Sequence, residues 1–388
     1  MPPTLRLPRA DGTLASYTLS GRAAITPPTG PITSRIGMAA VHVVADPVAA
    51  INPTLDVALD WDATLRYRHY VWSLGLAVAE AMDTSQRGMG FDWPTARELI
   101  RRSVAEARTV RGAVLASGAG TDQLAPGASV TLADVEAAYE EQCSFIEGAG
   151  GRIILMASRA LAACARGPED YEKVYARILA QVSEPVIIHW LGDMFDPALA
   201  GYWGSLDLDR ATETLLGIVH EYAARIDGVK ISLLDQRREI AMRARFPKGV
   251  RMYTGDDFDY PTTIRGDGQR ASDALLGIFD VIAPAASAAL HALDAGDVAR
   301  FEAILAPTLT LSRHVFGAPT RFYKTGVVFA AYLNGHQAHF RMVGGLESAR
   351  SVVHVSEQLV LMDRAGLLRD PDLAAERMRR VLALAGVD

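Results

Sequence analysis

Eight short apolar runs follow one another along the chain from residue 38, each separated from the next by a loop and a stretch of helical periodicity. Most of these runs are apolar throughout, as expected for parallel strands that are covered on both faces. The runs span residues 39–45, 76–82, 113–117, 153–157, 186–191, 228–233, 250–254 and 277–282. Eight β-then-α units in order predict a (β/α)8 barrel. An open doubly wound sheet is the structural alternative, but no G-x-G-x-x-G motif follows the first run.

The chain is longer than such a barrel requires, so we expect extensions at both ends. Residues 1–37 are rich in Pro, Gly and Thr. Within them, short runs around Asp11-Gly12 predict a hairpin that is followed by a linker. We place the barrel at residues 38–300 and a C-terminal helical region at 301–388. That region holds more helical segments than barrel closure needs, which favours a contact surface for a homo-oligomer, either a dimer or a tetramer.

Charge and cysteine content restrict the partners and the compartment. The net charge is −6, and the most basic segment, residues 237–245, has the spacing of a solvated helix face. We therefore expect no nucleic-acid partner. No apolar run approaches 18 residues, so we expect no membrane partner. Cys143 and Cys164 fit neither a disulfide framework nor a metal site, and no signal peptide is visible, which favours a reducing, cytoplasmic setting.

Lys230 is the leading catalytic candidate. It lies inside the apolar run at 228–233, where a lysine costs several kcal/mol unless it is paired or neutral. Burial lowers the pKa of an amine, and a neutral amine is a nucleophile for carbonyl carbon. The alternatives are a lysine paired with Asp256 or Asp257, or one on the outer face of the barrel. If Lys230 is catalytic, its side chain must point into the barrel near the end of the sixth strand.

Several motifs around Lys230 resemble those of one enzyme family. Asp227-Gly228-Val229-Lys230 is similar to a G-[IV]-K strand, and Tyr253-Thr254-Gly255-Asp256-Asp257 is similar to an S-G-D-D motif. Residues 277–284 resemble that family's eighth strand, and residues 319–335 resemble a later helix. Over residues 38–340 the chain resembles the dihydrodipicolinate synthase and N-acetylneuraminate lyase superfamily, the Schiff-base class I aldolase barrels, as a divergent branch. The resemblance implies that Lys230 forms a Schiff base with a substrate carbonyl.

The chain departs from this family at the fifth strand. The family relays protons to and from the adduct through a tyrosine there, and this chain has His189 at that place. A histidine can also transfer protons. The alternative is a core histidine whose ring nitrogens are satisfied locally. Because the fifth and sixth strands are neighbours, we expect His189 to lie within reach of Lys230, directly or through one water molecule.

Candidate substrate contacts stand at the ends of the second and seventh strands. Thr84 and Ser85 keep hydroxyls where the family binds the carboxylate of a 2-oxo acid. Asp83 adds a negative charge just before them and is a candidate to bind a sugar hydroxyl instead. Gly255 and Asp256 follow the seventh strand. For the Asp256-Asp257 pair, Mg²⁺ binding and a structural role are the alternatives, and the structural role is preferred.

Two arginines replace neutral or acidic groups of the family pattern. Arg87 stands in place of a glutamate, and Arg159 stands where the family has a tyrosine pair on the fourth strand. Two guanidinium groups at one mouth favour a substrate with an additional anionic or strongly polar group. The alternative is that Asp83 or Asp122 pairs with them inside the protein.

These residues support three functional hypotheses. The first is a Schiff-base-forming lyase, an aldolase or dehydratase, that acts on a 2-oxo acid or keto-sugar derivative with Lys230 as nucleophile and His189 as proton relay. It requires a small-molecule carbonyl substrate, and we expect neither a cofactor nor a metal. The second is a metal-dependent barrel hydrolase or isomerase that uses His42, His189 and Asp256. The third is a non-catalytic small-molecule sensor on a degenerate barrel.

Overall fold

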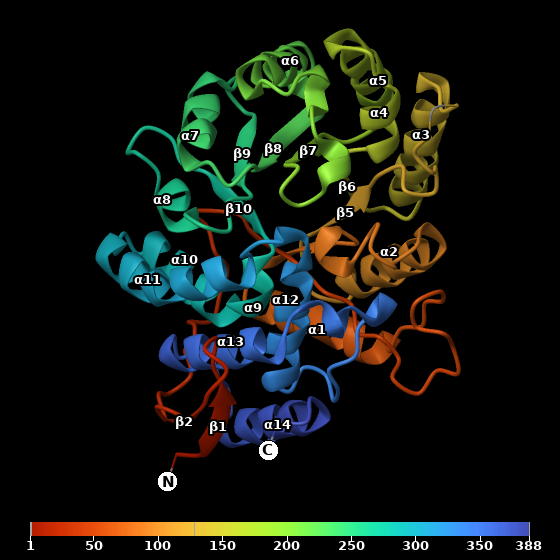
Figure 1. Cartoon of the computed structure of the whole chain (residues 1–388). Helices are drawn as coiled ribbons and strands as arrows, with labels where there is room; N and C mark the ends of the chain where they lie inside the picture. Colours follow the sequence, from red (N-terminus) through yellow and green to blue (C-terminus); the bar gives the residue numbers. More distant parts are fainter. Residues whose placement is uncertain (1, 128, 388) are drawn as a thin grey trace.

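Eight parallel strands close into a barrel in the computed structural model, which describes residues 2–127 and 129–387 (Figure 1). The strands are hydrogen-bonded in the order β10-β3-β4-β5-β6-β7-β8-β9. Their bounds are β3 (Gly37–Ala40), β4 (Ala77–Glu80), β5 (Leu115–Ala119), β6 (Arg152–Leu155), β7 (Val186–Leu191), β8 (Ile226–Ser232), β9 (Arg251–Thr254) and β10 (Asp273–Leu276). The predicted (β/α)8 barrel is confirmed.

The first and last strands differ from those predicted. β3 begins at Gly37 and ends at Ala40, ahead of most of the run at 39–45. The run at 277–282 is not a strand, because β10 precedes it and Ile278–Val281 forms the short helix α9. A continuous apolar run does not distinguish a buried strand from a buried helix segment. All four residues of α9 are buried, so the same composition suits either structure.

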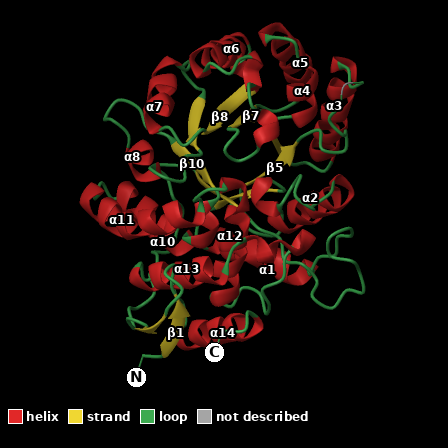
Figure 2. Cartoon of the chain, viewed as in Figure 1, coloured by secondary structure: helices red, strands yellow, loops and turns green. Residues whose placement is uncertain are grey.

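Helices form the layer outside the strands (Figure 2). They are α1 (Trp61–Ser73), α2 (Trp93–Ala107), α3 (Leu132–Gly148), α4 (Arg159–Cys164), α5 (Pro168–Gln181), α6 (Leu208–Glu221), α7 (Gln236–Arg245), α8 (Tyr260–Arg265) and α10 (Ala283–Asp294). The residues at their starts explain where several begin. Asp92 caps α2 ahead of Pro94, and Thr131 forms a reciprocal capping box with Asp134 at the start of α3.

Alternate side chains of the strands fill the inside of the barrel. On β7, Ile187 belongs to this interior cluster, so His189, two residues further along, points to the same side. Lys230 of β8 is in register with His189 and with Tyr253 of β9, another member of the cluster. The side chains of His189 and Lys230 therefore project into the barrel. The cluster consists of Met38, Ala40, Ala77, Ala79, Met82, Ala116, Ile154, Met156, Ile187, Tyr253 and Leu275.

The C-terminal part of the chain adds helices beyond barrel closure, which confirms the predicted helical extension. They are α11 (Val298–Val315), α12 (Tyr323–Leu333), α13 (Val352–Arg364) and α14 (Pro371–Leu384). The N-terminal strands β1 (Thr4–Pro8) and β2 (Leu14–Thr18) pair as an antiparallel hairpin that packs on α13 and α14 (Figure 1). Helix α12 packs against α9 and against η1 (Asp83–Ser85). Because η1 follows β4, this contact places α12 at the mouth where the strands end.

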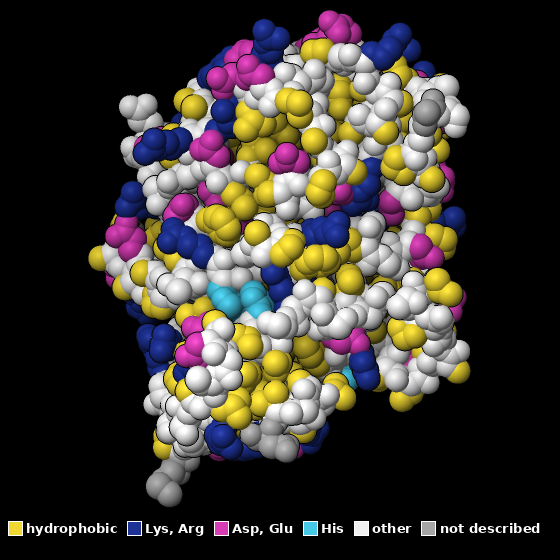
Figure 3. Space-filling model, in the orientation of Figure 1, with side chains coloured by type: hydrophobic (Ala, Val, Ile, Leu, Met, Phe, Trp, Pro, Cys, Tyr) yellow, Lys and Arg dark blue, Asp and Glu magenta, His cyan; other side chains and the backbone are white. Residues whose placement is uncertain are grey.

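No helix in the described part of the chain is long and apolar enough to cross a membrane. On the face shown in Figure 3, Lys and Arg side chains are interspersed with Asp and Glu side chains and with apolar groups.

Candidate active site

Lys230 lies two residues before the carboxyl end of β8, the end at which active sites of such barrels are found. Its side chain is buried, and this burial lowers the pKa of the amine below that of a lysine in water. The carboxylates of Asp257 and Asp83 lie close enough to act in the opposite direction and favour the ammonium form. An amine with a lowered pKa reaches its neutral, nucleophilic form at a lower pH.

Of the two aspartates after β9, Asp257 is the neighbour of Lys230. Asp257 accepts a hydrogen bond of 2.9 Å from the backbone N–H of Ile278, and burial raises its pKa to about 7. Oδ1 of Asp256 accepts hydrogen bonds from the N–H groups of Phe258 and Asp259 and so closes a turn, while Oδ2 has no hydrogen-bond partner among the described residues. Its expected contact with substrate stays a prediction. From the sequence, Asp257 was considered as a partner of the lysine and, together with Asp256, as a Mg²⁺ ligand or a structural residue.

His189 is a buried neutral histidine beside Lys230. Its Nε2 lies 3.1 Å from Ser232 Oγ, and its Nδ1 lies 3.9 Å from a carboxylate oxygen of Asp83. Nδ1 has no hydrogen-bond partner among the described residues. Burial, with the Lys230 ammonium as a second cause, holds the pKa of His189 well below its usual value. One ring nitrogen is thus engaged by Ser232 and the other remains available.

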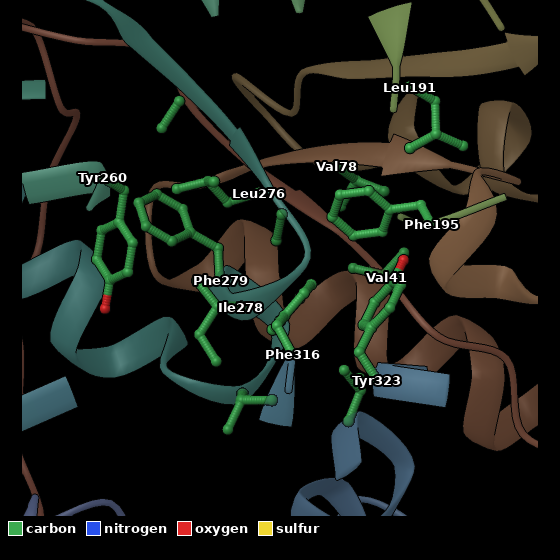
Figure 4. Packing of buried hydrophobic residues seen from close by; sticks show 14 of the residues in the cluster. Val41, Val78, Leu191, Phe195, Tyr260, Leu276, Ile278, Phe279, Phe316 and Tyr323 are labelled. Atoms are coloured by element: carbon green, nitrogen blue, oxygen red, sulfur yellow. The ribbon is translucent and has the colours of Figure 1, made fainter. Parts of the chain in front are cut away.

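The residues of η1 meet a tyrosine that the sequence analysis missed. Thr84 Oγ1 lies 2.7 Å from the hydroxyl of Tyr323, in the first turn of α12, and Ser85 donates a 2.7 Å bond to the backbone carbonyl of Val41. Tyr323 stacks on Phe316 and meets Phe195 edge-on, with ring centroids 4.3 and 6.1 Å apart (Figure 4). No local pattern marked Tyr323, because its partners come from η1, from the loop after β7 and from the end of α11.

Arg87 does not have the free donors that the sequence analysis expected. Its guanidinium donates to both carboxylate oxygens of Asp122, to Gln142, and to the backbone carbonyls of Ala81 and Gly118. The side chain is almost fully buried. Pairing with Asp122, the alternative considered from the sequence, is therefore what the structure shows for Arg87.

Arg159 keeps part of its guanidinium exposed. Its Nε donates to Asp196 in the loop after β7, a partner that the sequence analysis did not name. Its terminal nitrogens lie against the backbone of Gly88, where an added Cβ would be 2.1 Å from Nη1. The side chain is 29 % exposed, in contrast to that of Arg87. Arg159 therefore faces a cavity while Arg87 belongs to its wall.

Two adjoining cavities open at this mouth, with volumes of about 100 and 70 Å³. Both are lined by Asp83, Arg87, Gly88, Arg159 and Leu191, and the smaller one also by Asp196, Arg321 and Lys324. Asp83 also lies beside His189 and acts on the pKa of Lys230. Asp83 therefore connects the cavities to the buried pair of Lys230 and His189.

The family described as "Protein of unknown function (DUF993)" matches residues 5–387. The chain belongs to the DUF993 family. No curated protein sequence matches the chain.

Solved structures share the fold of this DUF993 protein. A prophage protein of the dihydrodipicolinic acid synthase family from E. coli K12, solved in complex with pyruvate, has a TM-score of 0.67 at 14 % identity, over 86 % of this chain and 99 % of its own. A putative dihydrodipicolinate synthetase from Pseudomonas aeruginosa has a TM-score of 0.63 at 16 % identity, over 86 % and 100 %. Dihydrodipicolinate synthase from Aquifex aeolicus has 0.60 at 13 %, over 91 % and 98 %. The resemblance drawn from the motifs is thus confirmed for the fold.

In this DUF993 protein, Gly255, a candidate substrate contact, also has a structural reason to be glycine. At Gly255 an added Cβ would lie 2.3 Å from Ser232 Oγ and 2.6 Å from the carbonyl oxygen of Ile231, so glycine lets the end of β9 approach β8.

Among the described residues, no three His, Cys, Asp or Glu side chains are grouped so that they could hold a metal ion. The set of His42, His189 and Asp256 needed by the metal-dependent alternative is therefore not assembled.

Proposed function

We propose that this DUF993 protein is a Schiff-base-forming lyase, an aldolase or a dehydratase, that acts on a 2-oxo acid or keto-sugar derivative. The observation that carries the proposal is the position of Lys230 inside the mouth of the barrel, in register with His189 and beside two carboxylates. The fold shared with dihydrodipicolinate synthases supports the same class of chemistry by analogy.

In the proposed mechanism the neutral amine of Lys230 attacks the substrate carbonyl carbon, and loss of water from the adduct gives the Schiff base. The positive nitrogen then acidifies the hydrogens on the adjacent carbon. His189 accepts one of these protons and returns it later, while the resulting enamine carries the bond-forming or bond-breaking step. Asp257, whose pKa is raised to about 7, is placed to exchange a proton with the Lys230 nitrogen.

The proposal assigns the carboxylate of a 2-oxo acid to η1. Thr84 and Ser85 are buried there, and their hydroxyls are held by Tyr323 and by the carbonyl of Val41. Ser85 uses its one hydroxyl hydrogen on Val41, so the hydroxyl of Thr84, with Tyr323 donating to its oxygen, would be the oriented donor to the carboxylate. Asp83, the first residue of η1, places a negative charge next to this position, so the donor of Thr84 has to offset its repulsion.

Borohydride trapping tests the proposal directly. Wild-type protein incubated with 2-oxobutyrate and sodium borohydride should gain the mass of one reduced adduct, and peptide mapping should place it on Lys230. Lys230→Met should abolish the adduct because the nucleophile is lost. Lys248→Met, at an exposed lysine, is the matched control and should trap as wild type does. An unmodified wild-type protein across a panel of 2-oxo acids and keto sugars would instead favour the sensor.

A further inference from the structure

Arg159 has donors that no group of the protein uses. Its Nε is bound to Asp196, and among the described residues neither terminal nitrogen has a hydrogen-bond partner. The guanidinium lies against Gly88, where an added Cβ would be 2.1 Å from Nη1 and 2.6 Å from Nη2. A planar fork with two free ends, held at the wall of a cavity, suits a carboxylate.

Lys324 faces the same cavity from a different element. It lies in the first turn of α12, it is buried, and its Nζ donates 3.1 Å to the backbone carbonyl of Arg321. Burial lowers its pKa to about 8, so the amine is still largely protonated at neutral pH. The charged groups that act on its pKa are Asp83, Arg159, Asp196 and Arg321. The ammonium also lies 4.5 Å from the centroid of the Tyr323 ring, and among the described residues the bond to Arg321 is its one hydrogen bond.

The charges around the smaller cavity do not cancel. Arg87 is matched by Asp122, and Arg159 shares Asp196 through its Nε. Asp83 then remains as the single carboxylate against both Lys324 and Arg321. Lys324 is buried while Arg321 is exposed, and Arg159 and Arg321 repel the Lys324 ammonium whereas Asp83 and Asp196 attract it. An anionic ligand would relieve this repulsion.

We propose that Arg159 and Lys324 form a subsite for a second carboxylate, carried at the end of the substrate away from the carbonyl that reacts with Lys230. The substrate class becomes a dianionic 2-oxo acid. This inference rests on the proposed function for the position of the reacting carbonyl, and the cavity volume of about 70 Å³ leaves room for a carboxylate-sized group.

The test compares acids that differ only in the second carboxylate. Half-saturation of borohydride trapping is measured for 2-oxoglutarate against 2-oxopentanoate, and for 2-oxoadipate against 2-oxohexanoate. In at least one pair, trapping should be half-maximal at a concentration of the dianion roughly ten- to a hundredfold lower than that of the monoanion, because charge-assisted bonds hold the second carboxylate. Arg159→Gln and Lys324→Gln should each lower this preference, measured as the ratio of the two half-saturation concentrations within a pair, by about tenfold.

Two controls keep the result specific. Lys324→Arg retains the positive charge and should restore most of the preference. Arg177→Gln, at an exposed arginine of α5 that pairs with Glu140, should behave as wild type. Equal half-saturation of dianions and monoanions in both pairs by the wild type would overturn the subsite and leave the Schiff-base function standing.

Absence of any adduct would overturn the Schiff-base function instead, and the subsite would then be judged by calorimetric titration of glutarate. Binding to the wild type that is lost in Arg159→Gln supports the subsite. No binding of glutarate to the wild type overturns it.

Discussion

At the scale of single residues, His189 is held neutral by two effects that act in the same direction. Burial disfavours the imidazolium, and the nearby Lys230 ammonium repels a second positive charge. Ser232 occupies Nε2, so Nδ1 is the nitrogen that can exchange a proton with an adduct. A histidine with so low a pKa is a weak base, and it removes a proton only from a carbon whose hydrogens are already acidified. A Schiff base acidifies the hydrogens on the adjacent carbon.

Replacing His189 by Phe should separate adduct formation from proton transfer. The variant keeps Lys230 and an aromatic ring of similar size, so trapping with 2-oxobutyrate should persist. Exchange of the C3 hydrogens of 2-oxobutyrate in D2O, followed by NMR, should slow by roughly a hundredfold, the usual contribution of a positioned proton-transfer group. Ser232→Ala, which keeps the imidazole, is the comparison. Unchanged exchange in His189→Phe would assign the proton to another group, with Asp257 the next to test.

At the scale of elements, Glu239 ties helix α7 to the two strands beside it. Its carboxylate oxygens accept hydrogen bonds of 2.8 Å from Thr254 of β9 and from Ser272, which precedes β10. The carboxyl is buried, and burial raises its pKa from 4.5 to about 7. The folded state therefore holds the proton more tightly than the unfolded chain does. The stability contributed by this group is full below pH 4.5 and declines as the pH rises towards 7.

Glu239→Gln should remove this decline. The amide can keep both contacts, because the two hydroxyls can turn, and it does not ionise. Relative to wild type, the free energy of unfolding of the variant should rise by about 2–3 kcal/mol between pH 5 and pH 8, measured by urea denaturation. Glu213→Gln is the control, since Glu213 is exposed and its pKa is lowered by Arg245, below this range. A difference that does not change with pH would show that Glu239 titrates normally.

At the scale of the whole molecule, the C-terminal helices and the N-terminal hairpin form one body beside the barrel. Tyr17 of β2 donates a 2.6 Å bond to Asp363 of α13, which joins the two ends of the chain. A groove of about 500 Å³ between α12, α13 and α14 is lined by apolar side chains such as Val355 and Val381 and by charged ones such as Glu347 and Arg380. Leu384, at the end of α14, also lines this groove and is 79 % exposed.

We expect a dimer or tetramer in sedimentation velocity experiments at micromolar concentration. Leu384→Glu should shift the distribution towards smaller species, because it places a charge in an apolar contact. Leu206→Glu changes a leucine of equal exposure in the loop before α6 and should leave the distribution unchanged. A monomeric wild type would refute the expectation. A shift to smaller species in Leu206→Glu but not in Leu384→Glu would place the contact between subunits on the barrel.

The period of the apolar runs alone determined the barrel, and the position of Lys230 within one run indicated the buried lysine. Both are properties of neighbouring residues: strands covered on two faces are apolar throughout, and alternation along a strand decides which side chains point inwards. The capping residues of α2 and α3 were readable for the same reason. The eighth strand was misplaced because its apolar run suited a buried helix equally well.

Only the tertiary structure decided which groups meet at the mouth of the barrel. Tyr323 reaches Thr84 from α12, Asp122 rather than a ligand satisfies Arg87, and Asp257 rather than Asp256 faces Lys230. Each outcome depends on the distance and orientation of side chains that lie far apart along the chain, and no local pattern encodes these. Arg87 and Arg159 look alike in the sequence, but they differ in how many of their donors the fold has already used.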